Sequence, residues 1–267
     1  MMKKPALINP SASSQDLVVS PKLKVTTGKR KLMFQAMIFT LTYLSYAAMH
    51  FTRSGWSILK SDVRSNASPG LGWEGNNNAG IVDFFFMFSY SFGLFASGVL
   101  GDNFPIRIIV PIGYLTVAAM TIMITLGGTW GITSVFYYIV FFSISGLAQS
   151  IAWPSYISTM DNWFPRESRG LVFGVWCTCQ NMGNIGGNVL VNILRNNANM
   201  NWMWNFRTIG IIIGVFGILN FLMLIDHPSK KGIIINLPEE EEEEETIPSS
   251  RNSGKFRHLG ENTNGDG

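Results

Sequence analysis

The sequence has few charged residues: only 14% are Asp, Glu, Lys or Arg, against about a quarter in ordinary soluble proteins. Residues 108–160 contain none of them, whereas most of the charge lies before residue 32 and after residue 226. This distribution excludes an ordinary soluble globule. The lack of a basic surface also argues against nucleic acid as a partner. A long uncharged interior between polar ends is typical of a polytopic membrane protein embedded in a lipid bilayer.

Cysteine is scarce too, with only Cys177 and Cys179 in the chain. Two positions apart on a helix, they point roughly 200° away from each other, which argues against a shared metal ion or a mutual disulfide. The sequence also lacks a His/Cys/carboxylate cluster with metal-ligand spacing, a glycine-rich phosphate loop followed by Lys-Ser/Thr, and a nucleophile elbow. We therefore expect no enzymatic activity, no metal and no cofactor.

Long apolar runs are abundant, and they predict the architecture. A helix needs about 20 mostly apolar residues to cross a bilayer. Six segments meet this requirement: residues 32–53, 79–100, 106–126, 132–160, 170–194 and 206–225. We expect an all-α membrane protein in which residues 32–226 form six transmembrane helices. Residues 1–31 and 227–267 are expected to be disordered tails, basic and acidic respectively, because the glutamate run Glu239–Glu245 cannot bury itself.

Lys and Arg residues in the short loops predict the orientation. With a cytoplasmic N-terminus, the cytoplasmic side would carry Lys29, Arg30, Lys31, Arg107, Arg166, Arg169, Lys230 and Lys231. The opposite side would carry only Lys60, Arg64, Arg195 and Arg207, together with the glycosylation sequon that starts at Asn66. This bias predicts that both termini are cytoplasmic.

A stripe of polar side chains runs along the first predicted span. Tyr46, His50, Arg53, Ser57 and Lys60 are spaced by four, three, four and three residues, which puts them on one helical face. A cation inside a membrane helix is costly unless it faces a cavity or a partner. The alternatives are that Arg53 reaches the interface from the helix end and that His50 is an ordinary buried histidine. A forked guanidinium suits phosphate oxygens, so the stripe favours an anionic, phosphate-bearing ligand.

The segment from Gly98 to Arg107 joins the second and third spans. It combines small residues, Asp102 at the membrane boundary, a tight turn and a basic residue. It can be an ordinary short loop, but it resembles the signature between helices two and three of the major facilitator superfamily. The resemblance implies that Gly98, Asp102, Arg107 and Arg169 form a conformational gate, which fastens the cytoplasmic side during alternating access.

The sequence from Tyr46 to Lys60 resembles the first helix of the organophosphate:phosphate antiporters within that superfamily. It is most similar to the eukaryotic sugar-phosphate exchangers, relatives of the glycerol-3-phosphate permeases. Further matching stretches are residues 83–93, 146–154, 162–170 and 175–187. The resemblance implies exchange of glycerol-3-phosphate or a sugar phosphate for inorganic phosphate, in the endoplasmic reticulum membrane rather than the plasma membrane. The implied substrate-binding residues are Arg53, which grips the phosphate, with His50, Tyr46, Lys60, Gln149 and Asn181.

The sequence departs from that family at two positions. A lysine commonly follows the arginine where this chain has Ser54, and bacterial members place a histidine near Gln180. In addition, the chain suits one N-terminal bundle of two inverted three-helix repeats, whereas the family uses two such bundles. The partner of this bundle would be a second six-helix half or a second copy of the chain. The alternative is a half-transporter without transport activity that acts as a membrane interaction or regulatory protein.

The fifth span holds a second polar stripe of Asn181, Asn184, Asn188 and Asn192. In a membrane, asparagines either line a cavity or form hydrogen bonds between helices, and the sequence leaves both readings open. The glycines Gly183, Gly186 and Gly187 favour close helix packing rather than ligand contact. In the fourth span, Pro154 is expected to kink the helix.

Overall fold

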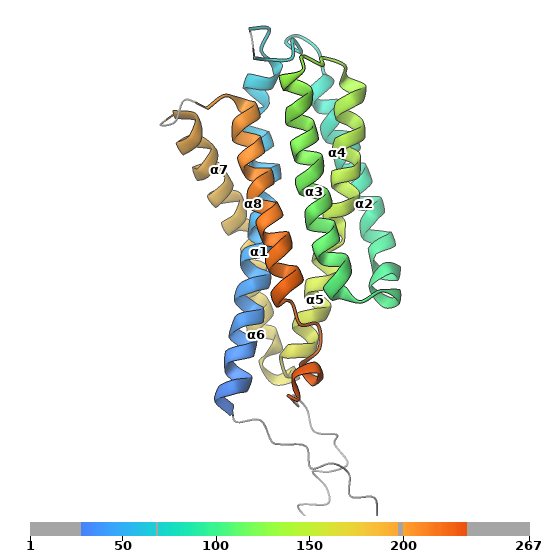
Figure 1. The fold of residues 1–267 in the computed structure, drawn as a ribbon, viewed down its shortest axis with the longest axis vertical. Helices are drawn as coiled ribbons and strands as arrows, with labels where there is room; N and C mark the ends of the chain where they lie inside the picture. The colour runs from blue at the N-terminus through green and yellow to red at the C-terminus, as the bar shows by residue number, and fades with distance from the viewer. Residues whose placement is uncertain (1–27, 68, 197–199, 234–267) are drawn as a thin grey trace, which may run out of the picture. The chain divides into compact units, whose positions relative to one another are not determined.

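The computed structural model of the chain describes residues 28–67, 69–196 and 200–233, including all side chains except those of residues 99–103. Within these ranges every regular element is helical, which confirms the expected all-α fold (Figure 1). The helices are α1 (Gly28–Arg64), α2 (Asn78–Asn103), α3 (Ile106–Thr129), α4 (Val135–Ser150), α5 (Ala152–Trp163), α6 (Arg166–Cys177), α7 (Cys179–Asn196) and α8 (Trp202–Met223), followed by the short 3-10 helix η1 (Pro228–Lys231). The expected tails lie mostly outside the described residues.

Five helical segments are long and apolar enough to cross a membrane: Gly28–Arg64, Asn78–Gly98, Ile106–Thr129, Val135–Trp163 and Trp202–Met223. They correspond to five of the six expected spans. The remaining one, residues 170–194, is divided between α6 and α7, with the break at Thr178. The asparagines and glycines of α7 lower its mean hydropathy. The position of this helix in the bundle is therefore set by packing against α1 rather than by its own apolar surface.

The fourth span is interrupted near the position of the expected kink, and the interruption separates α4 from α5 at Ile151. Pro154 has no amide hydrogen, and its ring clashes with the carbonyl four residues earlier, at Ser150, where α4 ends. Ile151 nevertheless keeps right-handed helical dihedrals (φ −66°, ψ −33°), and Val135–Trp163 counts as one candidate span. The two helices together therefore form a single span with a local break.

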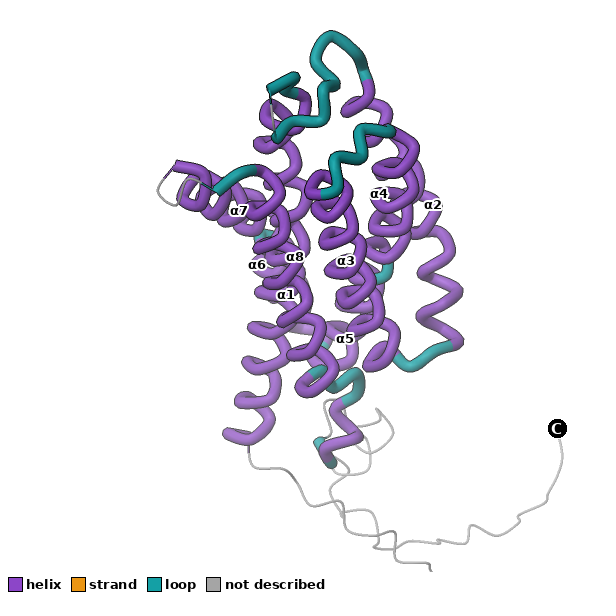
Figure 2. Tube along the Cα trace, turned by 45° about the horizontal axis from the view of Figure 1, so that its top comes forward, coloured by secondary structure: helices purple, strands orange, loops and turns teal. Residues whose placement is uncertain are grey.

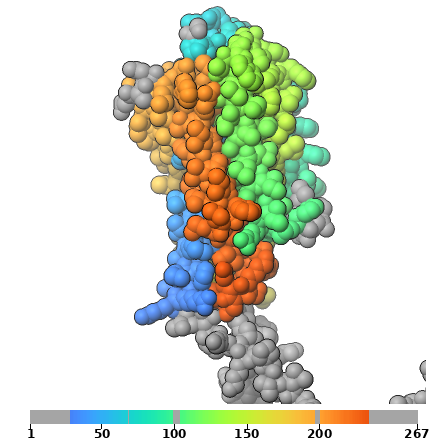
Figure 3. Space-filling model, viewed as in Figure 1, coloured from blue at the N-terminus to red at the C-terminus, as the bar shows by residue number. Residues whose placement is uncertain are grey.

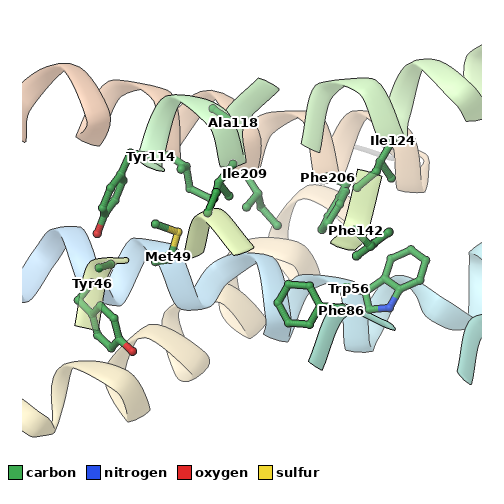
Figure 4. Packing of buried hydrophobic residues seen from close by; sticks show 14 of the residues in the cluster. Tyr46, Met49, Trp56, Phe86, Tyr114, Ala118, Ile124, Phe142, Phe206 and Ile209 are labelled. Atoms are coloured by element: carbon green, nitrogen blue, oxygen red, sulfur yellow. The ribbon is translucent and has the colours of Figure 1, made fainter. Parts of the chain in front are cut away.

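The helices pack side by side, most extensively as the pairs α3 with α8, α2 with α4 and α1 with α7 (Figure 2). Aromatic side chains fill the centre of the bundle (Figure 4). Trp56 of α1 meets Phe142 of α4 and Phe206 of α8, with ring centroids 4.6 and 6.0 Å away. The core thus joins helices that are distant in the sequence.

Glycines bring α7 close to α1. A Cβ atom on Gly183 would overlap the backbone carbonyl of Ala47, and one on Gly187 would overlap the hydroxyl of Ser54. The ring of Phe51 lies 3.2 Å from the position of a Cβ on Gly186. All three glycines therefore serve close packing, as the sequence predicted, and larger residues would push the two helices apart.

A chain of buried hydrogen bonds links α1, α5 and α8. The Tyr156 hydroxyl donates to the Asn220 side-chain oxygen over 3.0 Å, and the Asn220 amide donates to the Ser45 hydroxyl over 2.8 Å. Each of these polar groups is enclosed by apolar side chains, where an unpaired donor or acceptor is costly. The network therefore fixes how these three helices are rotated against one another.

The segment after α8 continues to contact the helices, and its residues 227–233 are the start of the expected tail, whose disorder stays a prediction. The Trp163 indole donates to the Ile225 carbonyl over 2.7 Å, and the Asn162 amide donates to that of Asp226 over 3.2 Å. Beyond η1, Ile233 packs against Trp163 and Ile38. These contacts attach the start of the expected tail to the ends of α1 and α5.

Candidate functional site

A cavity of about 280 Å³ lies among α1, α2, α3, α4 and α8. Its charged lining residues are Arg53 and Lys60 of α1 and Asp83 of α2, and Gln149 of α4 adds a polar group. The remaining wall is mainly apolar and aromatic. The cavity therefore carries a net charge of one positive unit, from two cations and one carboxylate, inside a segment expected to span the membrane.

Arg53 is held in place without an acidic partner among the described residues. Its guanidinium carbon lies 4.1 Å from the ring centroid of Tyr90 and 5.4 Å from that of Phe86. Its Nε donates to the side-chain oxygen of Gln149 over 3.4 Å. Ring faces stabilise the cation without neutralising it. The terminal nitrogens of the guanidinium are consequently available for an anionic ligand, in the forked arrangement that phosphate oxygens accept.

Gln149 is itself fixed by its neighbours. It is buried, and its amide nitrogen donates to the Thr52 hydroxyl over 3.1 Å and to the Ser145 hydroxyl over 3.4 Å. These donations orient its oxygen toward Arg53. The structure therefore brings together two of the expected site residues, Arg53 of α1 and Gln149 near the end of α4.

Lys60 is also in the cavity, and it pairs with Asp83. The second carboxylate oxygen of Asp83 accepts a hydrogen bond from the Trp56 indole over 2.7 Å. Both ion-pair partners keep about a third of their side-chain surface exposed, 29% for Lys60 and 37% for Asp83. The pair is thus accessible from the cavity, and a bound anion would compete with Asp83 for the Lys60 ammonium.

Tyr46 and His50 lie on the same helix but do not line this cavity. Each is 4% exposed, and their rings meet edge to face with centroids 5.0 Å apart. Tyr46 also packs against Trp153 and Trp176, at 5.3 and 5.7 Å. In this conformation both residues belong to the aromatic packing next to the site.

Asn181, the expected substrate-binding residue on α7, does not line the cavity around Arg53. It is exposed on α7, as are Asn188 and Asn192, while Asn184 is half-buried. None of the four lines the cavity around Arg53. Asn184 instead forms a side-chain hydrogen bond with His50 of α1, and the other three amides are exposed.

The structure describes the side chains of only some of the residues expected to form the gate. Gly98 is exposed, with open space around the position of a Cβ, and the side chain of Asp102 lies outside the described part of the chain. Arg107 is exposed near the end of α8. Arg169 instead pairs with Asp161, and it donates to the carbonyl oxygens of Asp161 and Phe164 over 2.9 and 3.3 Å. The role of these residues in a gate stays a prediction.

Sequence reasoning assigned no role to three residues that the structure brings to the site. Asp83 was recognisable as a lone acid in an apolar run, which calls for a partner. Tyr90 and Trp56 carried no such signal, because aromatic residues are frequent in membrane helices. Their contacts with Arg53 and Asp83 depend on how α1 and α2 face each other, which periodicity along one helix does not determine.

Comparison with known proteins identifies relatives of this chain. It is 30% identical over 262 residues to the glucose-6-phosphate exchanger SLC37A2 of Danio rerio, which covers 90% of this chain and 52% of that protein. The human SLC37A2 is 32% identical over 220 residues, 74% of this chain and 43% of that protein. The human glucose-6-phosphate exchanger SLC37A1 is 32% identical over 239 residues, which cover 77% of this chain and 44% of that protein. The chain thus spans about half the length of the curated relatives it matches.

These relatives confirm the similarity to sugar-phosphate exchangers that the first helix suggested. The family profile described as Major Facilitator Superfamily matches residues 32–259, which includes all but the first four residues of α1 and the whole of α2 to α8. Proteins of this superfamily are transporters embedded in membranes. On this match and the helical architecture together, the chain is a multi-pass membrane protein that belongs to the Major Facilitator Superfamily.

Proposed function

We propose that this chain binds a phosphorylated sugar or glycerol and inorganic phosphate, and carries them in exchange across a membrane by alternating access. The observation that supports it best is Arg53, a cation without an acidic partner among the described residues, in a cavity of about 280 Å³. An uncompensated cation in a membrane segment is expensive unless an anion neutralises it. The relatives are glucose-6-phosphate exchangers, which makes a sugar phosphate the first candidate solute.

In this proposal Arg53 holds the phosphoryl oxygens, and Gln149 sets the direction of the guanidinium. Lys60 supplies a second positive charge when the anion draws it from Asp83, while Trp56 retains the carboxylate. Tyr46 and His50 pack beside the helical turn of α1 that carries Arg53. They would contact the ligand only after a movement of α1. Exchange follows because the occluded state with an empty, unneutralised Arg53 is higher in energy than the loaded one.

A second half completes the carrier in this proposal. Asn181, Asn188 and Asn192 are exposed along α7, and lipid does not provide hydrogen-bond partners for side-chain amides. We infer that this stripe faces a water-filled pathway shared with another six-helix bundle, which is either a separate polypeptide segment or a second copy of the chain. Asn181 would then reach the solute across that pathway.

The orientation and the membrane are further parts of the proposal. The Lys and Arg bias of the loops favours cytoplasmic termini, and the gate of Gly98, Asp102, Arg107 and Arg169 would then act on the cytoplasmic side. The endoplasmic reticulum is the membrane we propose. Protease accessibility of epitopes at both ends, in sealed microsomes, tests orientation and location together.

The exchange itself is tested in proteoliposomes that contain the purified chain and are loaded with inorganic phosphate. We expect uptake of labelled glucose 6-phosphate and labelled phosphate, and its loss in Arg53→Ala. Arg64→Ala is the matched control, because Arg64 is an exposed arginine at the end of the same helix. Uptake by Arg53→Ala at the wild-type rate would disprove the assignment of Arg53.

The alternative is a half-transporter that regulates a larger relative. The chain aligns with about half the length of its relatives, and in this alternative that half binds a larger relative instead of carrying a solute. In that case the chain alone gives no exchange, but its addition changes the exchange rate of a co-reconstituted full-length relative. Arg53→Ala would leave that regulation intact, which separates the alternative from the transport proposal.

A further inference from the structure

A second cavity, of about 310 Å³, opens where α1, α3 and the end of α8 meet. Its apolar side is formed by Phe34 and Met37 of α1 and by Leu222 and Met223 of α8. Figure 3 shows this face of the molecule, with the orange-red end of α8 lying between the blue start of α1 and the green helix α3. The cavity is separate from the one around Arg53 and shares no lining residue with it.

Charged residues gather on the other side of this cavity. Arg107 comes from the start of α3, and Asp226, Lys230 and Lys231 come from the segment after α8. Asp226 is 5% exposed and accepts two hydrogen bonds from Lys230, at 2.7 and 2.8 Å. Arg107 and Lys231 form no ion pair within the described residues. Two cations that lack an ion-pair partner in the described part of the chain therefore line this cavity.

The basic side is preorganised by its backbone. Pro228 starts the 3-10 helix η1, and Gly232 ends it with φ at 66°, a conformation that side chains disfavour. The backbone amide of His227 donates to Asp226 over 3.1 Å. Burial would raise the pKa of Asp226, but the Lys230 ammonium lowers it overall, so the carboxylate stays ionised and pairs with Lys230. The lysines therefore lie on a short helical turn beside the cavity.

An exposed apolar face leads into the cavity along α8. Ile211, Val215, Ile218 and Leu222 are exposed at spacings of four, three and four residues, which form one stripe on that helix. Ile108 and Ile112 are exposed on the adjacent α3. In a membrane this face contacts acyl chains. The cations sit at its end, where lipid headgroups lie.

We propose that this cavity is a binding site for an anionic phospholipid, whose phosphate contacts Arg107 and Lys231 and whose acyl chains follow α8. Basic pockets between transmembrane helices at the membrane boundary suit such headgroups. A cavity with apolar side chains on one side and cations on the other fits an amphiphilic ligand. A soluble phosphate would make no contact with the apolar side chains of Phe34, Met37 and Leu222. The proposal is independent of what the Arg53 cavity carries.

The test uses the full chain in nanodiscs of phosphatidylcholine with increasing phosphatidylglycerol. Lipid retained per chain is measured by native mass spectrometry, and thermal unfolding is followed in parallel. Arg107→Gln/Lys231→Gln should retain phosphatidylglycerol on the order of tenfold less than the wild type, since both interfacial cations are lost. Arg64→Gln/Arg166→Gln is the matched control, because it removes two exposed arginines outside the cavity.

Asp226→Asn gives a second, opposite test. It frees Lys230 while preserving the side-chain shape that accepts from His227, so retention of phosphatidylglycerol should increase several-fold. Equal retention by the wild type, Arg107→Gln/Lys231→Gln and the control would overturn the proposal. So would displacement of the lipid by millimolar inorganic phosphate or glycerophosphoglycerol, because either result indicates a site for a free anion.

Discussion

Replacing Asp83 by asparagine should strengthen phosphate binding. The carboxylate pairs with Lys60 inside the cavity that also contains Arg53, so its removal raises the net charge of that cavity from one positive unit to two. Asparagine keeps a side-chain oxygen that can accept from the Trp56 indole. The substitution therefore changes charge with little change of shape, and it frees the Lys60 ammonium for the ligand.

The magnitude follows from Coulomb's law. At a separation of about 8 Å and an effective dielectric constant of about 20–40, one unit charge changes the energy of a bound monoanion by about 1–2 kcal/mol. This corresponds to a Kd for inorganic phosphate that is lower by about 5- to 30-fold. The upper dielectric value is included because about a third of the Lys60 and Asp83 side chains is exposed.

The assay is equilibrium binding of labelled phosphate to the purified chain in nanodiscs, with thermal unfolding as a check on folding. Lys60→Gln should weaken binding by a similar factor, and Asp83→Asn/Lys60→Gln should return it close to the wild-type value. Asp62→Asn is the matched control, since Asp62 pairs with Arg195 outside the cavity. A folded Asp83→Asn protein with unchanged or weaker phosphate binding would refute the electrostatic reasoning.

Two further predictions concern stability and are measured as shifts in the thermal unfolding of the chain in nanodiscs. Gly183→Ala should destabilise it by about 1–3 kcal/mol, because the added Cβ would overlap the Ala47 carbonyl, whereas Gly174→Ala, with open space around it, should have little effect. Asn220→Leu should cost about 1–3 kcal/mol by leaving the Tyr156 hydroxyl without its buried acceptor; an unfolding midpoint equal to that of the wild type would contradict the proposed network.

The sequence was sufficient for the features that depend on one helix at a time. Apolar runs predicted five of the spans, because the length needed to cross a bilayer and the cost of charge within it are general. Spacing along the first span put Arg53 and Lys60 on one face, and both line the same cavity. The proline rule located the break between α4 and α5.

Features that depend on two helices were harder to predict. The partner of Lys60 is Asp83 on the next helix, and periodicity does not say which residues of two helices will face each other. The same holds for Tyr46 and His50, which share the stripe with Arg53 but end in the aromatic packing around Trp153 and Trp176. The spacing of polar residues predicts which side chains share one face of a helix. Which of these side chains line a cavity depends on how the neighbouring helices pack against that face.

Ser54 shows how the structure changes the meaning of a sequence difference. A lysine at this position, as is common in the antiporter family, would be expected to add positive charge to the phosphate site, so serine suggested weaker binding. Ser54 is buried against Gly187 of α7, and its hydroxyl donates to the His50 carbonyl over 3.1 Å. It does not line the cavity around Arg53. In this conformation a lysine would separate α1 from α7 instead of reaching the anion, so serine serves helix packing and leaves the charge of the cavity to Arg53, Lys60 and Asp83.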